Sequence, residues 1–239
     1  MKIQIIKCLQ DNYSYLIIDE SNLYACVVDP SEAKPIIDFV ENNNINLKYI
    51  LNTHHHYDHV GGNKELKSKY NAKIIGFKKD CDRIPEIDIL VEDLEIWKRD
   101  NFEAKVYHIP GHTTGHIAFH FFNEKKIFTG DTLFSLGCGR IFEGTYEQMF
   151  NSLKKIKKLP KETKIYFGHE YTLQNSNFCE AYDSNNLQLK NKILEIKEKL
   201  KRGLPTTPTI LDEEIQCNIF LKAKDIQTFS KLRDLKDNF

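Results

Sequence analysis

Four side chains that bind divalent metals stand close together in one segment of the sequence. The segment follows the apolar run Tyr49–Leu51 and ends in Gly61 and Gly62. Imidazole nitrogen and carboxylate oxygen are ligands that a borderline ion such as zinc accepts. Packing explains so dense a group of donors poorly, and the alternative, a solvated histidine run, does not account for the acid that interrupts it. The four donors are His54, His56, Asp58 and His59.

The spacing within this segment suggests two neighbouring metal positions. His54 and His56 are two residues apart, so both can leave an extended loop on the same side. Asp58 and His59 can then face a second position beside the first.

Three other β-type runs also end in potential ligands, each next to a glycine. A lone aspartate at such a place is more often a turn or cap residue. Four strand ends that carry His or Asp are nevertheless better explained as one constellation than as separate accidents. The three additional ligands are His112 in Pro110–Gly115, Asp131 in Phe128–Thr132 and His169 in Ile165–Glu170.

Short strands and a few helices must position these loops. Ser31–Asn42 and Thr145–Leu159 have the apolar spacing of helices, and Thr145 with Gln148 fits a capping box. Hairpin-like strands mixed with helices predict an α+β sandwich, whose two sheets are covered by helices. The strand-length runs, rich in Ile, Val, Tyr and Phe, are Ile3–Lys7, Tyr13–Asp19, Ala25–Asp29, Lys48–Asn52, Lys73–Gly76, Glu103–Ile109, His116–Phe122 and Lys126–Gly130.

The strand signal stops after Lys164–Gly168, and the composition shifts near residue 169. The rest of the chain reads as helices, interrupted by the proline-containing loop Arg202–Thr209. We expect this helical part to pack directly on the sandwich. The expected helices are Glu170–Tyr182, Asn185–Lys201 and Asp225–Lys236.

Composition excludes several classes of function. The chain has 34 Lys plus Arg and 34 Asp plus Glu, so no net charge favours nucleic acid or an acidic membrane surface. The first twenty residues lack a signal-peptide core, and no spanning segment follows, so we expect a cytoplasmic protein. The six cysteines are scattered without a CxxC pair, as expected of reduced thiols that fill the core. We expect a monomer with no nucleic-acid or membrane partner.

The motif THHHYDH resembles the THxHxDH signature of the metallo-β-lactamase superfamily. The later motifs PGHT, GDT and GHE follow in the order of that superfamily. The chain is most similar to the hydroxyacylglutathione hydrolase (glyoxalase II) family, from Leu9–Tyr13 to Leu232–Asp237. This resemblance implies a metallo-β-lactamase-like αββα sandwich over residues 1–169, the catalytic domain, followed by a small helical substrate-binding domain over residues 170–239.

The resemblance also implies a dinuclear metal site. One metal ion would be held by His54, His56 and His112. The other would be held by Asp58, His59 and His169, with Asp131 as the bridging ligand. The metals would most commonly be zinc, with iron or manganese as alternatives, and Asp58 and Asp131 would take part in catalysis. The remaining histidines match no ligand position, and we expect structural roles for them: His55, His108, His116 and His120.

The activity that the resemblance implies is hydrolysis of S-D-lactoylglutathione and related 2-hydroxyacylglutathiones, the second step of methylglyoxal detoxification. Two divalent ions would lower the pKa of a bridging water, so that hydroxide attacks the thioester carbonyl. A thiol has a pKa of about 8.5, so the sulfur can depart with its charge and needs no general acid.

Recognition of glutathione would fall to residues near the C-terminus. Arg233 and Lys236, three apart on an expected helix, could hold a substrate carboxylate, although such a pair is usually only a solvated face. Arg140, Tyr171 and Phe142 are the other substrate-binding candidates. Phe142 stands where relatives often have Tyr, and Ile219 interrupts an NPF pattern, so both departures bear on substrate affinity.

Two other readings compete with this one. The chain could be a different superfamily enzyme, such as a glutathione-persulfide dioxygenase with one iron, a lactonase, a lactamase or an RNA-processing nuclease. The dioxygenases lack the helical extension with the terminal Arg and Lys, and a nuclease would carry a basic surface. A metal-binding protein without turnover is the second competitor, and a complete metal set beside a substrate clamp disfavours it.

Overall fold

The structure is a computed structural model that describes residues 1–239. The chain forms two compact units. The first comprises residues 1–108 and 115–124, and the second comprises residues 109–114 and 125–239. No helix of the chain is both long enough and apolar enough to cross a membrane.

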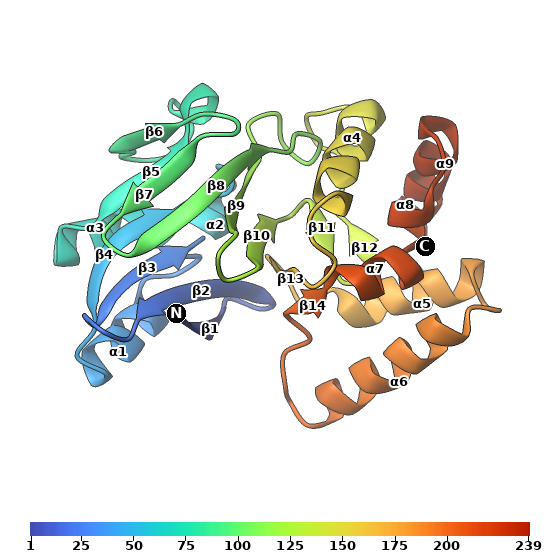
Figure 1. Ribbon diagram of the computed structural model, residues 1–239, viewed down its shortest axis with the longest axis horizontal. Helices are drawn as coiled ribbons and strands as arrows, with labels where there is room; N and C mark the ends of the chain where they lie inside the picture. Colours follow the sequence, from blue (N-terminus) through green and yellow to red (C-terminus); the bar gives the residue numbers. More distant parts are fainter. The chain divides into compact units, whose positions relative to one another are not determined.

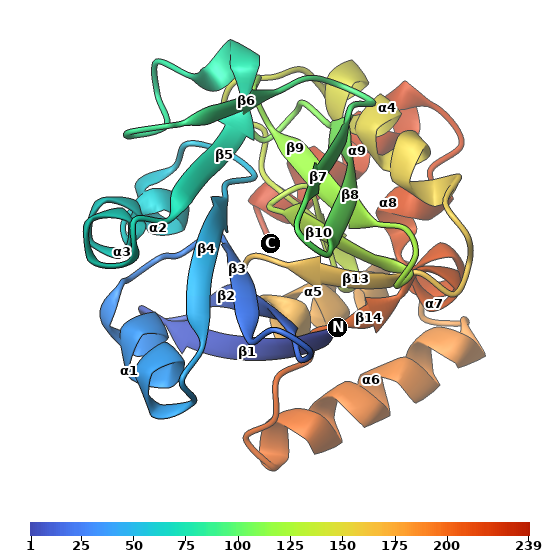
Figure 2. The ribbon, with the colours of Figure 1, turned by 60° about the vertical axis from the view of Figure 1, so that its left-hand side comes forward.

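A six-stranded sheet forms much of the first unit, with its strands in sequence order (Figure 2). The first three strands are antiparallel and the last four pair in parallel, which requires crossover connections between them. The strands are β1 (Lys2–Cys8), β2 (Asn12–Asp19), β3 (Tyr24–Val28), β4 (Asn46–Leu51), β5 (Lys73–Phe77) and β6 (Ile89–Val91).

Two crossover helices cover one face of this sheet. Helix α1 (Lys34–Asn42) connects β3 to β4, and α3 (Asn63–Tyr70) connects the loop after β4 to β5. Ile36 of α1 and Leu66 of α3 are fully buried in the apolar cluster on the sheet. The short helix α2 (Tyr57–Val60) lies inside residues 53–62, which we call the histidine segment. A 3-10 turn, Lys78–Asp80, follows β5.

Three antiparallel strands complete the first unit: β7 (Ile96–Arg99), β8 (Phe102–His108) and β9 (Ile117–Phe121). Phe102, Ala104 and Val106 of β8 are fully buried and alternate with more exposed residues. This period of two is typical of a strand with one face in the core.

The second unit combines a few strands with the helical C-terminal half of the chain (Figure 1). Strand β10 pairs in parallel with β13, which pairs antiparallel with the short β14, while β11 and β12 form a hairpin. The strands are β10 (Lys126–Gly130), β11 (Leu133–Phe134), β12 (Gly137–Cys138), β13 (Lys164–Phe167) and β14 (Thr209–Ile210). The helices are α4 (Tyr146–Lys157), α5 (Thr172–Tyr182), α6 (Leu187–Lys201), α7 (Leu211–Cys217), α8 (Ile219–Lys222) and α9 (Ile226–Asp237).

A buried carboxylate ties α7 to the β11–β12 hairpin. Glu214 is fully buried and accepts hydrogen bonds from the Ser135 hydroxyl (3.1 Å), the Leu136 amide (2.8 Å) and the Thr209 hydroxyl (2.7 Å). The Lys192 ammonium lies 3.0 Å away and offsets its charge. Removing any one partner would leave a buried polar group unsatisfied, so this network fixes the helices against the hairpin.

The structure confirms most of the expected elements. The capping box on Thr145 and Gln148 is present at the start of α4, and the three expected C-terminal helices correspond to α5, α6 and α9. All six cysteines are free, and all but Cys81 are buried. The sequence interpretation missed several elements, because they span too few residues or carry too weak an apolar pattern to register. These are the helices α2, α3, α7 and α8 and the strands β6, β7, β11, β12 and β14. The division at residue 169 stays a prediction.

Candidate metal centre

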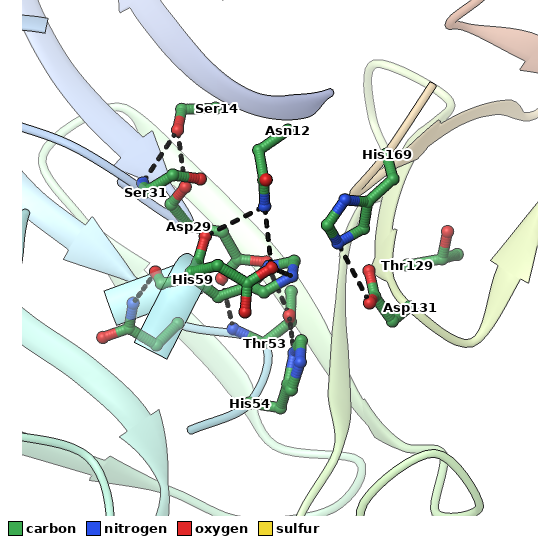
Figure 3. A network of polar contacts seen from close by, with 12 residues as sticks. Asn12, Ser14, Asp29, Ser31, Thr53, His54, His59, Thr129, Asp131 and His169 are labelled. Atoms are coloured by element: carbon green, nitrogen blue, oxygen red, sulfur yellow. Dashed lines mark hydrogen bonds and ion pairs between the residues drawn. The ribbon is translucent and has the colours of Figure 1, made fainter. Parts of the chain in front are cut away.

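Asp29 organises the histidine segment of the first unit from the end of β3. It is 2% exposed, and its φ of 48° is uncommon outside glycine. Its Oδ1 accepts the Thr53 amide (2.7 Å), and its Oδ2 accepts the Thr53 hydroxyl (2.6 Å) (Figure 3). Oδ2 also lies 3.0 Å from Nδ1 of His59. Asp29 therefore holds both ends of the segment at once.

These contacts decide which ring nitrogens can bind a metal. A carboxylate only accepts, so Nδ1 of His59 carries the hydrogen and Nε2 keeps its lone pair. Because the Thr53 hydroxyl donates to Asp29, its oxygen accepts from Nδ1 of His54, 3.0 Å away. His54 therefore also keeps its lone pair on Nε2. This pattern of an outer carboxylate or hydroxyl that orients a histidine is typical of metal sites.

Asp58 is oriented in the same way. The side-chain amide of Asn12 donates to Oδ2 of Asp58 (3.0 Å) and to its backbone oxygen (3.1 Å). Oδ2 of Asp58 lies 3.6 Å from Nε2 of His59. Two electron-rich atoms at this separation suit joint coordination of one cation.

Three further histidines of the first unit, His108, His116 and His120, lie beside aromatic or histidine rings. His116 is fully buried and stacks on His54 with 4.5 Å between ring centroids. His108 stacks on Phe77. Burial lowers the pKa of His120 to about 4, so this ring is neutral at physiological pH. These contacts agree with the structural roles expected for these residues.

Two predicted histidine ligands of the second unit converge on the carboxylate of a third ligand. Oδ2 of Asp131, at the end of β10, lies 3.2 Å from Nε2 of His169 (Figure 3) and 3.4 Å from Nε2 of His112. All three residues are buried. A Cβ on Gly139 would clash with the backbone oxygen of Asp131, so only glycine allows this close approach.

The hydrogen bonding of His112 shows that this cluster suits a cation. Nδ1 of His112 lies 2.9 Å from the carbonyl oxygen of Arg140, so Nδ1 donates and Nε2 carries a lone pair. That lone pair faces the carboxylate of Asp131. Two buried electron-rich atoms repel each other unless a cation or a proton lies between them. The donor set therefore fits a divalent metal ion.

Most of the predicted glutathione-binding residues lie on α9 and in the loop after β12, while Tyr171 directly precedes α5. Arg233 is buried, and its guanidinium donates to the Cys138 carbonyl (2.7 Å) and pairs with Asp237 (2.8 Å). Arg140 is exposed and reaches the same Asp237 at 3.5 Å. Arg233 is thus no part of a solvated face, which was the alternative to a substrate clamp.

Lys236 has an unusual environment for a lysine. Its Nζ lies 3.3 Å from the Gln174 carbonyl oxygen and 5.4 Å from the centroid of the Phe178 ring. Burial, and then the nearby Arg233, lower the pKa of Lys236 to about 8. The ammonium is therefore charged at neutral pH and easily discharged above it.

Two aromatic side chains flank the histidines of the second unit. Tyr171 stacks on His169 with the rings 4.8 Å apart and nearly parallel. Phe142 is 63% exposed and meets His112 edge-on at 5.2 Å. Ile219 is buried at the first position of α8, where proline would also fit, and Asn218 caps this helix through the Phe220 amide (3.1 Å).

Sequence reasoning did not identify Asp29 and Asn12 as parts of the site. The available signal for Asp29 was an aspartate directly before a proline after the apolar strand β3, a pattern that normally indicates a turn. Asn12 lies in the motif LQDNY, which the family resemblance covers without assigning it a role.

Comparisons with known proteins agree with this arrangement. The family description "Metallo-beta-lactamase superfamily" matches residues 10–169, and "Hydroxyacylglutathione hydrolase C-terminus" matches residues 170–239. A protein of Pelagibacter ubique (strain HTCC1062) named hydroxyacylglutathione hydrolase is 68% identical over the full length of both chains. One of the same name from Prochlorococcus marinus (strain MIT 9301) is 44% identical over 97% of this chain and 94% of its own.

Solved structures show the same fold at lower identity. The crystal structure of ETHE1 from Myxococcus xanthus has a TM-score of 0.75 at 23% identity and covers 98% of this chain and 90% of its own. TTHA1623 in a di-iron-bound form has a TM-score of 0.65 at 24% identity and covers 92% of this chain and 100% of its own. The predicted fold class, an α+β metallo-β-lactamase-like fold followed by a helical C-terminal part, is confirmed. The chain belongs to the hydroxyacylglutathione hydrolase family of the metallo-β-lactamase superfamily.

Proposed function

We propose that this enzyme hydrolyses S-D-lactoylglutathione and related 2-hydroxyacylglutathiones to glutathione and the hydroxy acid. The observation that carries the proposal is the full-length identity of 68% to a hydroxyacylglutathione hydrolase, together with the match of residues 170–239 to the C-terminal region of that family. The histidine and aspartate clusters support a divalent metal as the cofactor.

We propose that two ions, most commonly zinc, are held by the ligands that the family resemblance assigns. His54, His56 and His112 would bind one ion. Asp58, His59 and His169 would bind the other, and Asp131 would bind both. The hydrogen bonds that the Nδ1 atoms of His54, His59 and His112 make support this assignment, because each bond leaves Nε2 as the metal-binding nitrogen.

Two divalent ions, when bound, would supply a water of lowered pKa and positive charge for the developing oxyanion. The chain's own carboxylates then have distinct tasks. Asp131 and Asp58 offset the charge of the ions, while Asp29 and Asn12 keep His59 and Asp58 in their orientations. The glutathione thiol has a pKa of about 8.5, so its thiolate can leave without a protonating side chain.

We assign recognition of the glutathione part to Lys236, Arg140, Arg233, Tyr171 and Phe142. Lys236 and Arg140 offer cationic groups for the substrate carboxylates, and Arg233 braces α9 against the β11–β12 hairpin. We also propose that the enzyme is a cytoplasmic monomer without nucleic-acid or membrane partners. Its equal numbers of acidic and basic residues support the absence of nucleic-acid and anionic-membrane partners.

Thiol release by the purified protein tests this function. We expect hydrolysis of S-D-lactoylglutathione, slower hydrolysis of a lactoyl thioester that lacks the tripeptide, and no oxygen consumption with glutathione persulfide. Loss of activity after chelation and its return with Zn²⁺ would support the metal requirement. Oxygen consumption without thioester hydrolysis would instead support the dioxygenase reading.

A further inference from the structure

A buried carboxylate that has no part in the proposed ligand set lies beside the histidine segment. The Asp80 side chain is fully buried, in the 3-10 turn that follows β5. Strand β5 pairs in parallel with β4, whose end leads into the histidine segment. Parallel neighbours end at the same edge of a sheet, so the topology brings Asp80 to this segment.

Asp80 and Arg83 contact the two ring nitrogens of His55, the middle residue of the histidine triplet His54–His56. We call this arrangement the grip on His55. The Nε of Arg83 donates to Oδ1 of Asp80 (2.6 Å), and the Nη2 of Arg83 pairs with the same oxygen. Oδ2 of Asp80 lies 3.2 Å from Nδ1 of His55, and the Nη1 of Arg83 lies 3.4 Å from Nε2 of His55. Both ring nitrogens of His55 therefore face protein groups.

The chemistry of these partners allows only one arrangement of His55. A carboxylate only accepts and a guanidinium only donates, so Nδ1 of His55 donates to Asp80 and Nε2 accepts from Arg83. The His55 lone pair is thus directed to Arg83. Burial of the Asp80 charge is offset by Arg83 in the same contact.

The grip also bears on a proposed ligand. The rings of His55 and His56 meet edge-on, with 5.0 Å between their centroids. A Cβ on Gly115 would clash with the Asp80 carboxylate, so the backbone at Gly115 packs directly against this carboxylate. The grip therefore holds His55 in place directly beside a proposed ligand.

The geometry points to a selective role: Asp80 and Arg83 form a clamp that withholds His55 from the metals and thereby determines which histidines of the triplet bind them. The need for such a device follows from the sequence, since a divalent ion accepts any of three consecutive imidazoles. Asp80 and Arg83 are positioning residues. The inference rests on the proposed metal ligands and does not depend on the identity of the thioester substrate.

A double-mutant cycle with Zn²⁺ as the probe tests the clamp. Asp80→Asn replaces one carboxylate oxygen by an NH₂ donor, so the side chain no longer presents an acceptor to both His55 and Arg83 in their present positions. We expect Asp80→Asn to weaken Zn²⁺ retention against a competing chelator about 10- to 100-fold, an effect comparable to losing the outer partner of a metal ligand, because the released His55 would disturb the ligand set. His55→Ala should keep wild-type Zn²⁺ affinity within a few-fold, and His55→Ala combined with Asp80→Asn should restore it to that level.

Several outcomes would overturn the clamp. An unchanged affinity in Asp80→Asn would do so, and so would a double variant that binds Zn²⁺ as weakly as Asp80→Asn alone, because the carboxylate would then act independently of His55. The melting temperature in EDTA separates a general loss of fold from this effect. If Asp80→Asn does not fold, Arg83→Met gives the same cycle, and failure of His55→Ala to rescue it contradicts the inference. Turnover of S-D-lactoylglutathione by the wild type is measured separately, so a failure of the proposed substrate remains distinguishable.

Discussion

The histidine segment of the first unit and helix α9 of the second unit use polar side chains in opposite ways. In the segment, Asp29 and Thr53 take one nitrogen of His59 and of His54 and leave the other for a ligand. On α9, the guanidinium of Arg233 donates its hydrogen bonds to the Cys138 carbonyl and to Asp237, whereas Lys236 lies half-buried against aromatic rings. A charged side chain near a site can therefore stabilise the fold and have no contact with substrate. Its hydrogen-bond partners indicate its role better than its position does.

The largest effect is expected at the carboxylate shared by the two histidines of the second unit. Asp131→Asn should abolish turnover and empty at least one metal position, because it removes the charge that offsets the cations. Metal content and kcat, measured on the same preparation, check this. Asp38→Asn, at an exposed aspartate paired with Lys34, is the control and should change neither. Two retained metals with near-normal kcat would refute the role of Asp131.

The next largest effect is expected where the histidine segment is oriented. Asp29→Asn removes one of the two carboxylate oxygens that accept hydrogen bonds from Thr53 and His59. The orientation of His59 is then lost, and kcat/KM should fall about 10- to 100-fold. Asp100→Asn is the control, because Asp100 also accepts a side-chain hydrogen bond, a part-buried one from Tyr49 at 2.8 Å, and has no assigned role at the histidines. If both variants lose activity equally, the effect of Asp29 is one of stability alone.

The extent of sequence prediction differs between the two regions for a physical reason. His54, His56, Asp58 and His59 could be predicted because their chemical types are selective for metals and their spacing is local. The role of Asp29 could not, since it depends on a hydrogen bond to Thr53 across 24 positions of sequence.

Helix α9 shows the same limit. Its bounds were close to those expected, and Asp225 caps it through the Thr228 amide. The spacing of Arg233 and Lys236 placed both near one face, but only the packing of the β11–β12 hairpin determines that Arg233 is buried. The fold class, in contrast, followed from many short strands and helices whose apolar patterns are each local.

Arg233 and Lys236 should respond differently to the same substitution. Lys236→Met should raise KM for S-D-lactoylglutathione roughly tenfold with little change in kcat, because a contact to a remote carboxylate is uniform binding worth about 1.5 kcal/mol or more. Arg233→Met should chiefly lower stability, by about 1–3 kcal/mol, since the Cys138 carbonyl and Asp237 lose their donor. Kinetics and thermal unfolding on both variants check this. Equal KM effects without destabilisation would show that both residues bind substrate.

The charge of Lys236 predicts a pH dependence of KM. Its pKa of about 8 leaves the ammonium charged below that pH and neutral above it. KM for the anionic substrate should therefore stay constant near pH 7 and rise as the pH passes 8, while Lys236→Met shows no such rise. A rise of the same size in Lys236→Met would assign the titration to another group.

The smallest effect is expected at Phe142, the exposed ring beside His112. Phe142→Tyr adds a hydroxyl that relatives often have, and one hydrogen bond is worth about 0.5–1.5 kcal/mol, so KM should fall by less than about tenfold. Steady-state kinetics with S-D-lactoylglutathione measure this, and Phe142→Leu tests whether the ring itself contributes. Unchanged KM in Phe142→Tyr would place the substrate away from this residue.

The central claim, that this chain is a two-metal thioester hydrolase, is tested most directly by titrating metal-free protein with Zn²⁺ while following hydrolysis of S-D-lactoylglutathione. We expect the bound metal to reach about two ions per chain, activity to be maximal at this loading, and Asp131→Asn to fall short of it. Full activity with a single ion per chain, or no hydrolysis with two ions bound, would contradict it.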